Sequence, residues 1–151
     1  MLNLRAPVFV LASLGLFMLG DYAVAAEAIG YVRVLRGDAK LVQAGQETQA
    51  AMDAPVTQGS LIRTGPGASL GIIFKDNTVM ALGPATEISI DNYLYSPSQG
   101  RFKLDATLSK GTLAYLSGAI AKQNPEGVLL KTPTGAIGVR GSHFAIKVDD
   151  R

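Results

Sequence analysis

Residues 64–90 read TGPGASLGIIFKDNTVMALGPATEISI, and this stretch decides the fold class. Apolar side chains recur there at every second position, first at Leu70, Ile72 and Phe74. A period of two places these side chains on one face of an extended strand and leaves the other face to solvent. The stretch therefore predicts short, half-buried β-strands.

A short internal repeat lies within the same stretch. Residues 64–72 align with residues 82–90, and each copy puts a Gly-Pro corner in front of an alternating strand. Proline fixes φ and cannot donate to a β-ladder, so each corner should begin a strand and turn the chain. The repeat favours a twisted β-solenoid or β-roll-like architecture, with a two-layer β-sandwich as the competing layout.

The alternation continues on both sides of this stretch, from Ile29 to the end of the chain. Turn-forming residues separate the apolar runs, as in hairpins, and residues 109–111 are one such turn. Residues 44–56 are polar and irregular, and we expect a covering loop there. The prediction is one all-β domain of short antiparallel strands. The expected strands are residues 29–36, 39–43, 60–64, 68–75, 78–82, 86–95, 101–108, 111–117, 127–132, 136–140 and 143–148.

The composition fits a globular domain with a core, because 48% of the 151 residues are hydrophobic and 17% are charged. The net charge of +2 comes from 14 basic and 12 acidic residues that are spread along the chain. Nucleic-acid binding normally uses a clustered basic stripe, so a nucleic-acid partner is not expected. The chain has no cysteine, which excludes disulfides, thiolate metal ligands and cysteine nucleophiles.

Residues 1–26 have the pattern of a cleavable signal peptide, with a positive residue, an apolar run at residues 6–19 and small residues before the cut. The run is too short to cross a bilayer comfortably as a helix. We expect cleavage after Ala25 or Ala26, which leaves residues 27–151 as a mature domain without a membrane span. The expected location is the periplasm or the medium, and an uncleaved N-terminal anchor is the alternative.

Four blocks of the chain, in order and with normal spacing, resemble the FecR-like periplasmic domain family. They are GYVRVLRGDAKLV (30–42), QGSLIRTGPGASLGIIFKDNTVMALGPATEISI (58–90), RFKLDATLSKGTLAYL (101–116) and VLLKTPTGAIGVRGSHFAIKV (128–148). The resemblance implies an all-β periplasmic domain. In full-length relatives such a domain relays a signal from an outer-membrane TonB-dependent receptor to an inner-membrane sigma-factor regulator.

This sequence departs from those regulators in three places. Only five residues precede the apolar run, so we expect no sigma-binding segment, and the chain stops at Arg151 without a receptor-binding module. The pair Ser142-His143 stands where relatives commonly have a small hydroxyl residue followed by an acidic or polar one. The complete signalling circuit is therefore not transferred to this chain.

The sequence offers no catalytic constellation. His143 is the only histidine, and its strand neighbour Ser142 points to the opposite face, so the two cannot act as base and nucleophile. Asp76, Asp91 and Asp105 lie near expected strand ends, where solvated turn acids are usual. Residues 135–141 are rich in glycine, but they match neither the glycine motif of dinucleotide-binding domains nor a phosphate-binding loop. We expect no enzyme, no cofactor and no metal site.

Four residues are candidate contacts to a protein partner or a glycan: Tyr93, Tyr95, Arg140 and His143. The two tyrosines share a strand face and could stack on a sugar ring or an apolar side chain, whereas cross-strand packing at the core margin is the alternative. Arg140 could instead pair with a carboxylate, and His143 could be an ordinary strand residue.

The function predicted from these features is a non-enzymatic extracytoplasmic binding or regulatory module that holds an envelope protein. The alternative is a structural or glycan-binding protein of the cell envelope. The sequence leaves the partner and the oligomeric state open.

Overall fold

The structure is a computed structural model, and it describes residue 20, residues 25–139 and residues 143–149. Most of the expected signal peptide, Ser142 and Arg140 lie outside the described residues. The strands are β1 (Ala28–Arg36), β2 (Ala39–Gln43), β3 (Gln46–Gln49), β4 (Pro55–Thr57), β5 (Leu61–Thr64), β6 (Ser69–Phe74), β7 (Val79–Leu82), β8 (Glu87–Ser96), β9 (Arg101–Leu116), β10 (Val128–Thr132), β11 (Gly135–Gly138) and β12 (His143–Val148). The helix α1 (Ala119–Gln123) and two 3-10 turns, η1 (Pro97–Gln99) and η2 (Pro125–Gly127), complete the described part. No helix in it is long and apolar enough to span a membrane.

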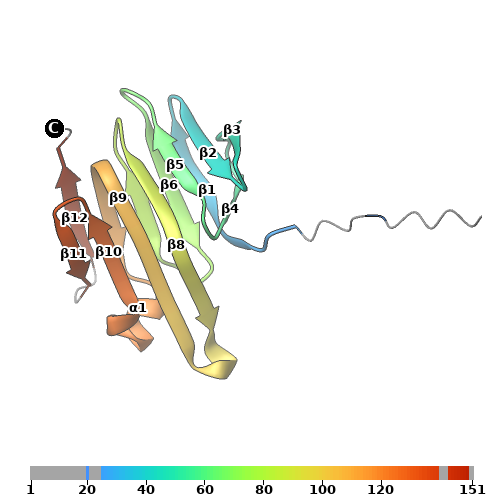
Figure 1. The fold of residues 1–151 in the computed structure, drawn as a ribbon, viewed down its shortest axis with the longest axis vertical. Helices are drawn as coiled ribbons and strands as arrows, with labels where there is room; N and C mark the ends of the chain where they lie inside the picture. The colour runs from blue at the N-terminus through green and yellow to red at the C-terminus, as the bar shows by residue number, and fades with distance from the viewer. Residues whose placement is uncertain (1–19, 21–24, 140–142, 150–151) are drawn as a thin grey trace, which may run out of the picture.

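All twelve strands belong to one strongly curled, half-barrel sheet (Figure 1). Its main order is β3-β2-β5-β8-β9-β7-β6-β1-β4, and β10 and β12 also pair with β9, while β11 pairs with β10. The pairs are antiparallel except for β9 and β10. The predicted all-β class is confirmed.

The layout predicted from the repeat is wrong, both as a solenoid or β-roll and as a sandwich. Strand β9 has 16 residues and runs through positions 109–111, where the sequence predicts a turn. Its first part pairs with β8 and its last part with β7, so it joins both halves of the sheet. Gly111 has a φ of 93°, and the facing strand has a register shift at Glu87, which together bend β9 instead of ending it.

The repeated Gly-Pro corners meet at one end of the sheet. The Thr64 hydroxyl donates to the Gly83 carbonyl at 2.6 Å, and the Ala85 amide donates to the Gly65 carbonyl at 3.1 Å. Pro66 is followed by Gly67 with a φ of 73°, the combination that a type II turn requires. The repeat therefore marks two corners that pack on each other, not successive coils.

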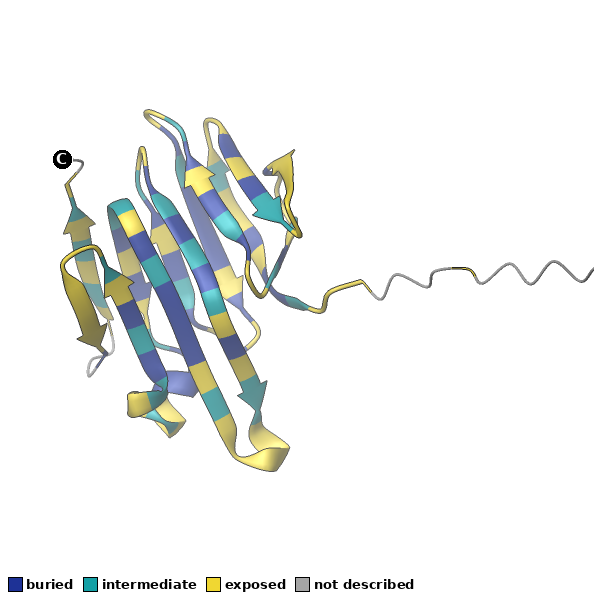
Figure 2. Ribbon diagram, in the orientation of Figure 1, coloured by how far each residue is buried: buried dark blue, intermediate teal, exposed yellow. Residues whose placement is uncertain are grey.

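The core fills the concave side of the curled sheet. Alternate residues are buried along most of the strands, so the ribbon in Figure 2 changes colour along them, whereas β3 and β11 are exposed throughout. Both halves contribute, for example Ile72 and Leu82 from one half and Ile62 and Leu104 from the other. Burying such a side chain stabilises the fold by about 1.5–3 kcal/mol.

The covering loop predicted at residues 44–56 is wrong in part, because it contains β3 and β4. Ala44 and Gly45 both have positive φ and form a two-residue hairpin turn between β2 and β3. Alanine rarely takes this conformation, and every residue of β3 is exposed and polar. Neither the turn nor the strand therefore leaves a recognisable pattern in the sequence.

Candidate functional site

Tyr93 lies inside the molecule, with 7% of its surface exposed. Its ring stacks on Phe74 with centroids 5.4 Å apart. Its hydroxyl donates to the Asp76 carboxylate at 2.8 Å and accepts from the Asp76 amide at 3.0 Å. Burial and this hydrogen bond raise the pKa of the Tyr93 hydroxyl. These contacts favour cross-strand packing over partner or glycan binding as the role of Tyr93. To contact a partner or a glycan, the ring would have to leave its buried position.

Tyr95 is half-buried at the far end of β8 and packs against Phe102, with ring centroids 6.1 Å apart. Both rings lie against the core. The two tyrosines therefore do not form an exposed aromatic platform, and a binding role for Tyr95 stays a prediction.

His143 begins β12 and is exposed, opposite Leu116 of β9. Tyr93 faces the core, so the two residues share no surface. Arg140 is outside the described residues. The structure thus does not gather the predicted contact residues into one site.

Asp76 forms a buried polar centre that the sequence analysis missed. An aspartate in a turn is normally exposed to solvent, so its position gave no sign of burial. Only 1% of its surface is exposed. One carboxylate oxygen accepts from the Tyr93 hydroxyl, and the other from the Thr78 hydroxyl at 2.6 Å and the Ile120 amide at 3.0 Å. All of these donors are neutral and tie β8 and α1 to the β6–β7 turn. The centre is structural, because its acceptor positions are filled by the protein itself.

The other two aspartates of the predicted turns are also held by their neighbours. Asp91 accepts from the Ser89 and Thr107 hydroxyls at 2.9 and 2.5 Å, and Asp105 accepts from Asn92 at 3.0 Å. Across the described residues, no three His, Asp or Glu side chains are grouped to hold a metal ion.

Among the described residues, four strands are paired on one side only: β3, β4, β11 and β12. Such an edge can accept an added strand. Strand β4 has three residues and begins with Pro55, and β11 has four residues, including two glycines. Strand β12 is the longest of the four, with six residues, and its Phe144, Ile146 and Val148 pack against the core.

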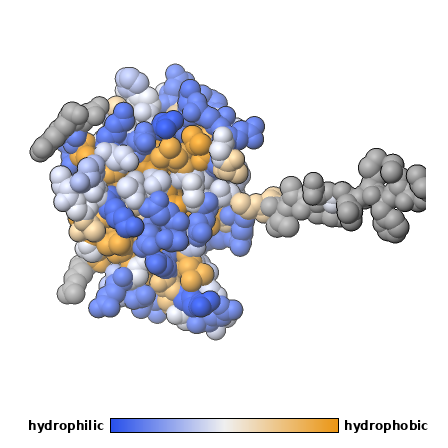
Figure 3. Space-filling view, in the orientation of Figure 1, coloured by the Kyte–Doolittle hydropathy of each residue, from blue (hydrophilic) through white to orange (hydrophobic). Residues whose placement is uncertain are grey.

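The convex side of the sheet over β2, β5 and β8 is charged. Arg63 pairs with Glu47 at 3.5 Å and with Glu87 at 3.1 Å, and Lys40 pairs with Glu47 at 2.9 Å. Hydrophilic side chains cover much of the face seen in Figure 3. This side has the usual surface of a solvated sheet.

The convex side over β1, β6, β7, β9 and β12 is apolar instead, and we call it the outer apolar face. Two parallel rows of side chains cross its strands. The first row is bulky and consists of Tyr31, Ile73, Val79 and Leu116, which lie side by side in register, with His143 at its β12 end. The second row is small and consists of Gly71, Ala81, Ala114 and Ala145, with Val34 at its β1 end. Tyr31, Ile73, Leu116 and Val34 are 37–50% exposed.

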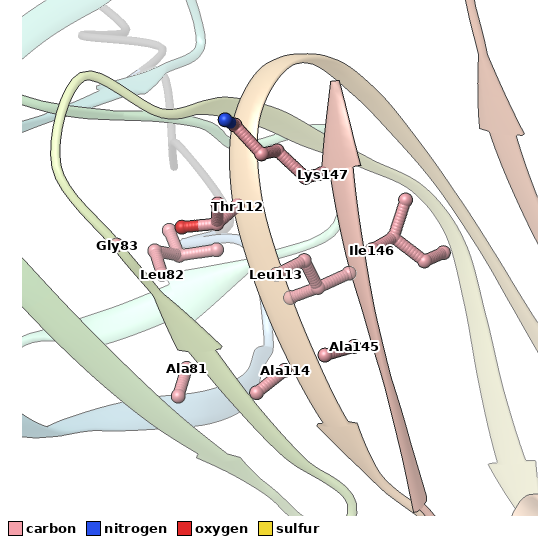
Figure 4. Close-up of a pocket in the computed structure, with 9 residues that line it drawn as sticks. All are labelled: Ala81, Leu82, Gly83, Thr112, Leu113, Ala114, Ala145, Ile146 and Lys147. Carbon is pink, nitrogen blue, oxygen red and sulfur yellow. The ribbon is translucent and has the colours of Figure 1, made fainter. Parts of the chain in front are cut away.

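The small row forms a shallow hollow of about 400 Å³ over β7, β9 and β12. Figure 4 shows Ala81, Ala114 and Ala145 at one end of this hollow and Thr112 and Lys147 at the other. The hollow contains no pair of titratable groups that could catalyse a reaction.

Comparison with known protein families matches residues 60–151 to the family described as FecR protein. The chain belongs to the FecR family. The matched region covers more than half of the chain, from the start of β5 through β12, and it includes every strand of the outer apolar face except β1. FecR domains are not known as enzymes. Comparisons with curated proteins and with solved structures found no match to this chain.

Proposed function

We propose that this FecR domain is a non-enzymatic regulatory module of the periplasm that holds a protein partner by pairing with a strand of that partner. The observation that carries the proposal is the open edge of β12, which is the longest edge strand among the described residues. An added strand supplies affinity through main-chain hydrogen bonds, while side chains of the neighbouring strand give specificity.

The other three edges are less suited to an added strand. Strand β4 lacks a donor at Pro55, β11 is short and glycine-containing, and β3 carries Glu47 in ion pairs with its neighbours. Short length, proline and charge are the usual ways in which proteins protect a sheet edge from pairing. The β12 edge has Lys147 as its main protection among Ala145, Ile146 and Val148.

The periplasmic location depends on export and removal of the leader. N-terminal sequencing of the protein isolated from the cell envelope should find Glu27 or Ala26 as the first residue, as cleavage after Ala26 or Ala25 requires. A purified protein that begins at Met1 would contradict this part of the proposal.

A photo-crosslinking experiment tests the edge. The chain has no cysteine, so Lys147→Cys can be labelled with a benzophenone at a single position on β12. The labelled protein is illuminated in envelope extract, and captured proteins are identified by mass spectrometry. We expect one partner, crosslinked through an extended segment, that also binds the unlabelled protein when purified. Leu94→Cys on β8 is the control, and equal capture at both positions would remove the proposal.

Glycan binding receives less support than protein binding. The aromatic pair that suggested it consists of a buried Tyr93 and a Tyr95 that packs on Phe102. Stacking on a sugar needs an exposed ring face, which Tyr93 does not offer. Tyr95→Ala should therefore leave binding to peptidoglycan or polysaccharide at the level of the unmodified protein.

A further inference from the structure

We propose that the outer apolar face binds a second copy of this chain, so that two FecR domains form a symmetric dimer. The proposal is independent of the strand-pairing edge, because it uses the face of the sheet and leaves the free side of β12 open. Among the described residues, four of the seven exposed large hydrophobic side chains belong to this one face: Tyr31, Val34, Ile73 and Leu116. Monomeric proteins rarely gather exposed apolar residues in this way.

The outer apolar face carries less charge than the other convex side of the sheet. Its two rows contain no Lys, Arg, Asp or Glu side chain and one histidine, His143, whereas the convex side over β2, β5 and β8 carries an ion-pair network. The Arg33 guanidinium lies 5.5 Å from the centroid of the Tyr31 ring and pairs with Asp53, and Lys147 pairs with Asp149 at 3.2 Å. These exposed ion pairs can stay hydrated at the rim of a dimer, which avoids the burial of an unpaired charge, the most costly event at an interface.

The two rows make the face complementary to itself. The bulky row and the small row are parallel and have one residue on each strand, so their spacing is the same, about 4.8 Å per strand. A two-fold axis between the rows, in the plane of the face, places the bulky row of one copy over the small row of the other. Val79 of one copy then faces Ala81 of the second, and Leu116 faces Ala114. Symmetric dimers require this kind of self-complementary surface.

The size of the face agrees with a weak dimer. Five strands and four rows of side chains, the two apolar rows and one border row on each side, span about 24 by 27 Å. Because the face is convex, the resulting area of about 650 Å² per copy is the upper limit of the contact. A total of about 1,300 Å² is at the lower end of specific interfaces. We therefore expect a dissociation constant on the order of micromolar.

Sedimentation velocity measures this equilibrium. The purified protein should change from monomer to dimer between about 1 and about 200 micromolar. Leu116→Ser should weaken the dimer at least about tenfold, since it removes the most exposed large hydrophobic side chain of the bulky row. Leu94→Ser is the matched control, because Leu94 is 40% exposed against 47% for Leu116 but lies on β8. A monomer at every concentration, or a dimer that Leu116→Ser does not weaken, would overturn the proposal.

Single cysteines test the geometry even if Leu116→Ser does not fold. The chain has no cysteine of its own, and Ala114 and Leu116 both point outward from β9. The axis places position 114 of one copy over position 116 of the other. Facing sheets lie about 10 Å apart, beyond the reach of a direct disulfide, so a short bis-maleimide is used as the crosslinker. The crosslinker should join Ala114→Cys to Leu116→Cys at least about tenfold faster than it joins Ala114→Cys to Leu94→Cys. Equal rates would overturn the proposed arrangement.

Discussion

Asp76 is the residue whose role departs most from its sequence context. A carboxylate after a strand is usually solvated, yet this one is buried and accepts hydrogen bonds from Tyr93, Thr78 and Ile120. Thr78 belongs to the same turn, whereas Tyr93 and Ile120 come from segments far away in the sequence. Sequence patterns do not show such distant donors, so the burial of Asp76 could not be predicted, while the packing of Tyr93 was one of two alternatives.

Replacing Asp76 should therefore destabilise the fold. Asp76→Ala leaves the Tyr93 hydroxyl and the Ile120 amide buried without an acceptor, and we expect the free energy of unfolding to fall by about 3 kcal/mol. Asp53→Asn is the control, because Asp53 is in an exposed ion pair with Arg33 and should change stability by less than about 1 kcal/mol. Urea denaturation of both variants measures the difference. Equal stabilities of the two variants would show that Asp76 does not organise this region.

The buried tyrosines predict a loss of stability at alkaline pH. Burial raises the pKa of Tyr93 and of Tyr115 above the ordinary tyrosine value, so the folded chain keeps protons that the unfolded chain releases. Stability is then complete below about pH 10 and decreases as the pH rises above it, by up to about 1.4 kcal/mol per pH unit for each tyrosine. Urea denaturation between about pH 8 and 11 measures the slope, and Tyr93→Phe should make it shallower. Parallel curves for the two proteins would contradict this assignment.

At the scale of elements, β9 organises the sheet. It pairs with β7, β8, β10 and β12, and its bend at Gly111 directs the last part of the strand into the second half of the sheet. A Cβ at Gly111 would be 2.4 Å from the Thr86 Cα and 2.1 Å from its hydroxyl oxygen. This close approach explains why the position needs glycine for space as well as for conformation.

Two glycine substitutions distinguish the steric cost of adding a Cβ atom from the cost of placing alanine at positive φ. Gly111→Ala and Gly100→Ala both put alanine at positive φ, 93° and 63°, but only position 100 has open space for a Cβ. We expect a cost of about 1 kcal/mol at Gly100 and of at least about 3 kcal/mol at Gly111, where the backbone of Thr86 must shift. Thermal unfolding followed by circular dichroism compares them. A similar cost at both positions would mean that the bend of β9 tolerates a side chain.

Of the four edge strands among the described residues, the sequence predicted β11 and β12 and missed β3 and β4. Strand β12 has clear alternation and was expected at residues 143–148, as observed. Strands β3 and β4 were not expected, since β3 is wholly exposed and β4 has only three residues. An edge strand depends on the backbone of its single neighbour and needs no apolar pattern of its own.

At the scale of the whole molecule, one core holds the two halves of the sheet together. Phe74 and Tyr93 stack across this core from β6 in one half and β8 in the other. The charged and apolar convex sides are therefore two surfaces of a single cooperative unit. The proposed strand pairing at the free edge of β12 and the proposed self-association through the outer apolar face would both use this one domain.

This arrangement predicts one cooperative unfolding transition. Far-ultraviolet circular dichroism reports the strands, and tyrosine fluorescence reports the core, because the chain has five tyrosines and no tryptophan. Both signals should change with the same midpoint in urea, as in other small single domains. Two separate midpoints would show that the halves of the sheet unfold independently.

The sequence by itself determined the class of the fold and the position of most strands, because alternation is a local property of a chain with one buried face. It also marked the two Gly-Pro corners. The tertiary structure alone decided how the strands are arranged, that β9 bends at Gly111 without ending, and that the two convex sides differ in character. These features depend on which distant segments become neighbours, and a local pattern carries no information about that choice. For the same reason, the residues that sequence reasoning selected for contact include a buried Tyr93, whereas Leu116 and Ile73 acquired their exposed neighbours only when five strands came into register.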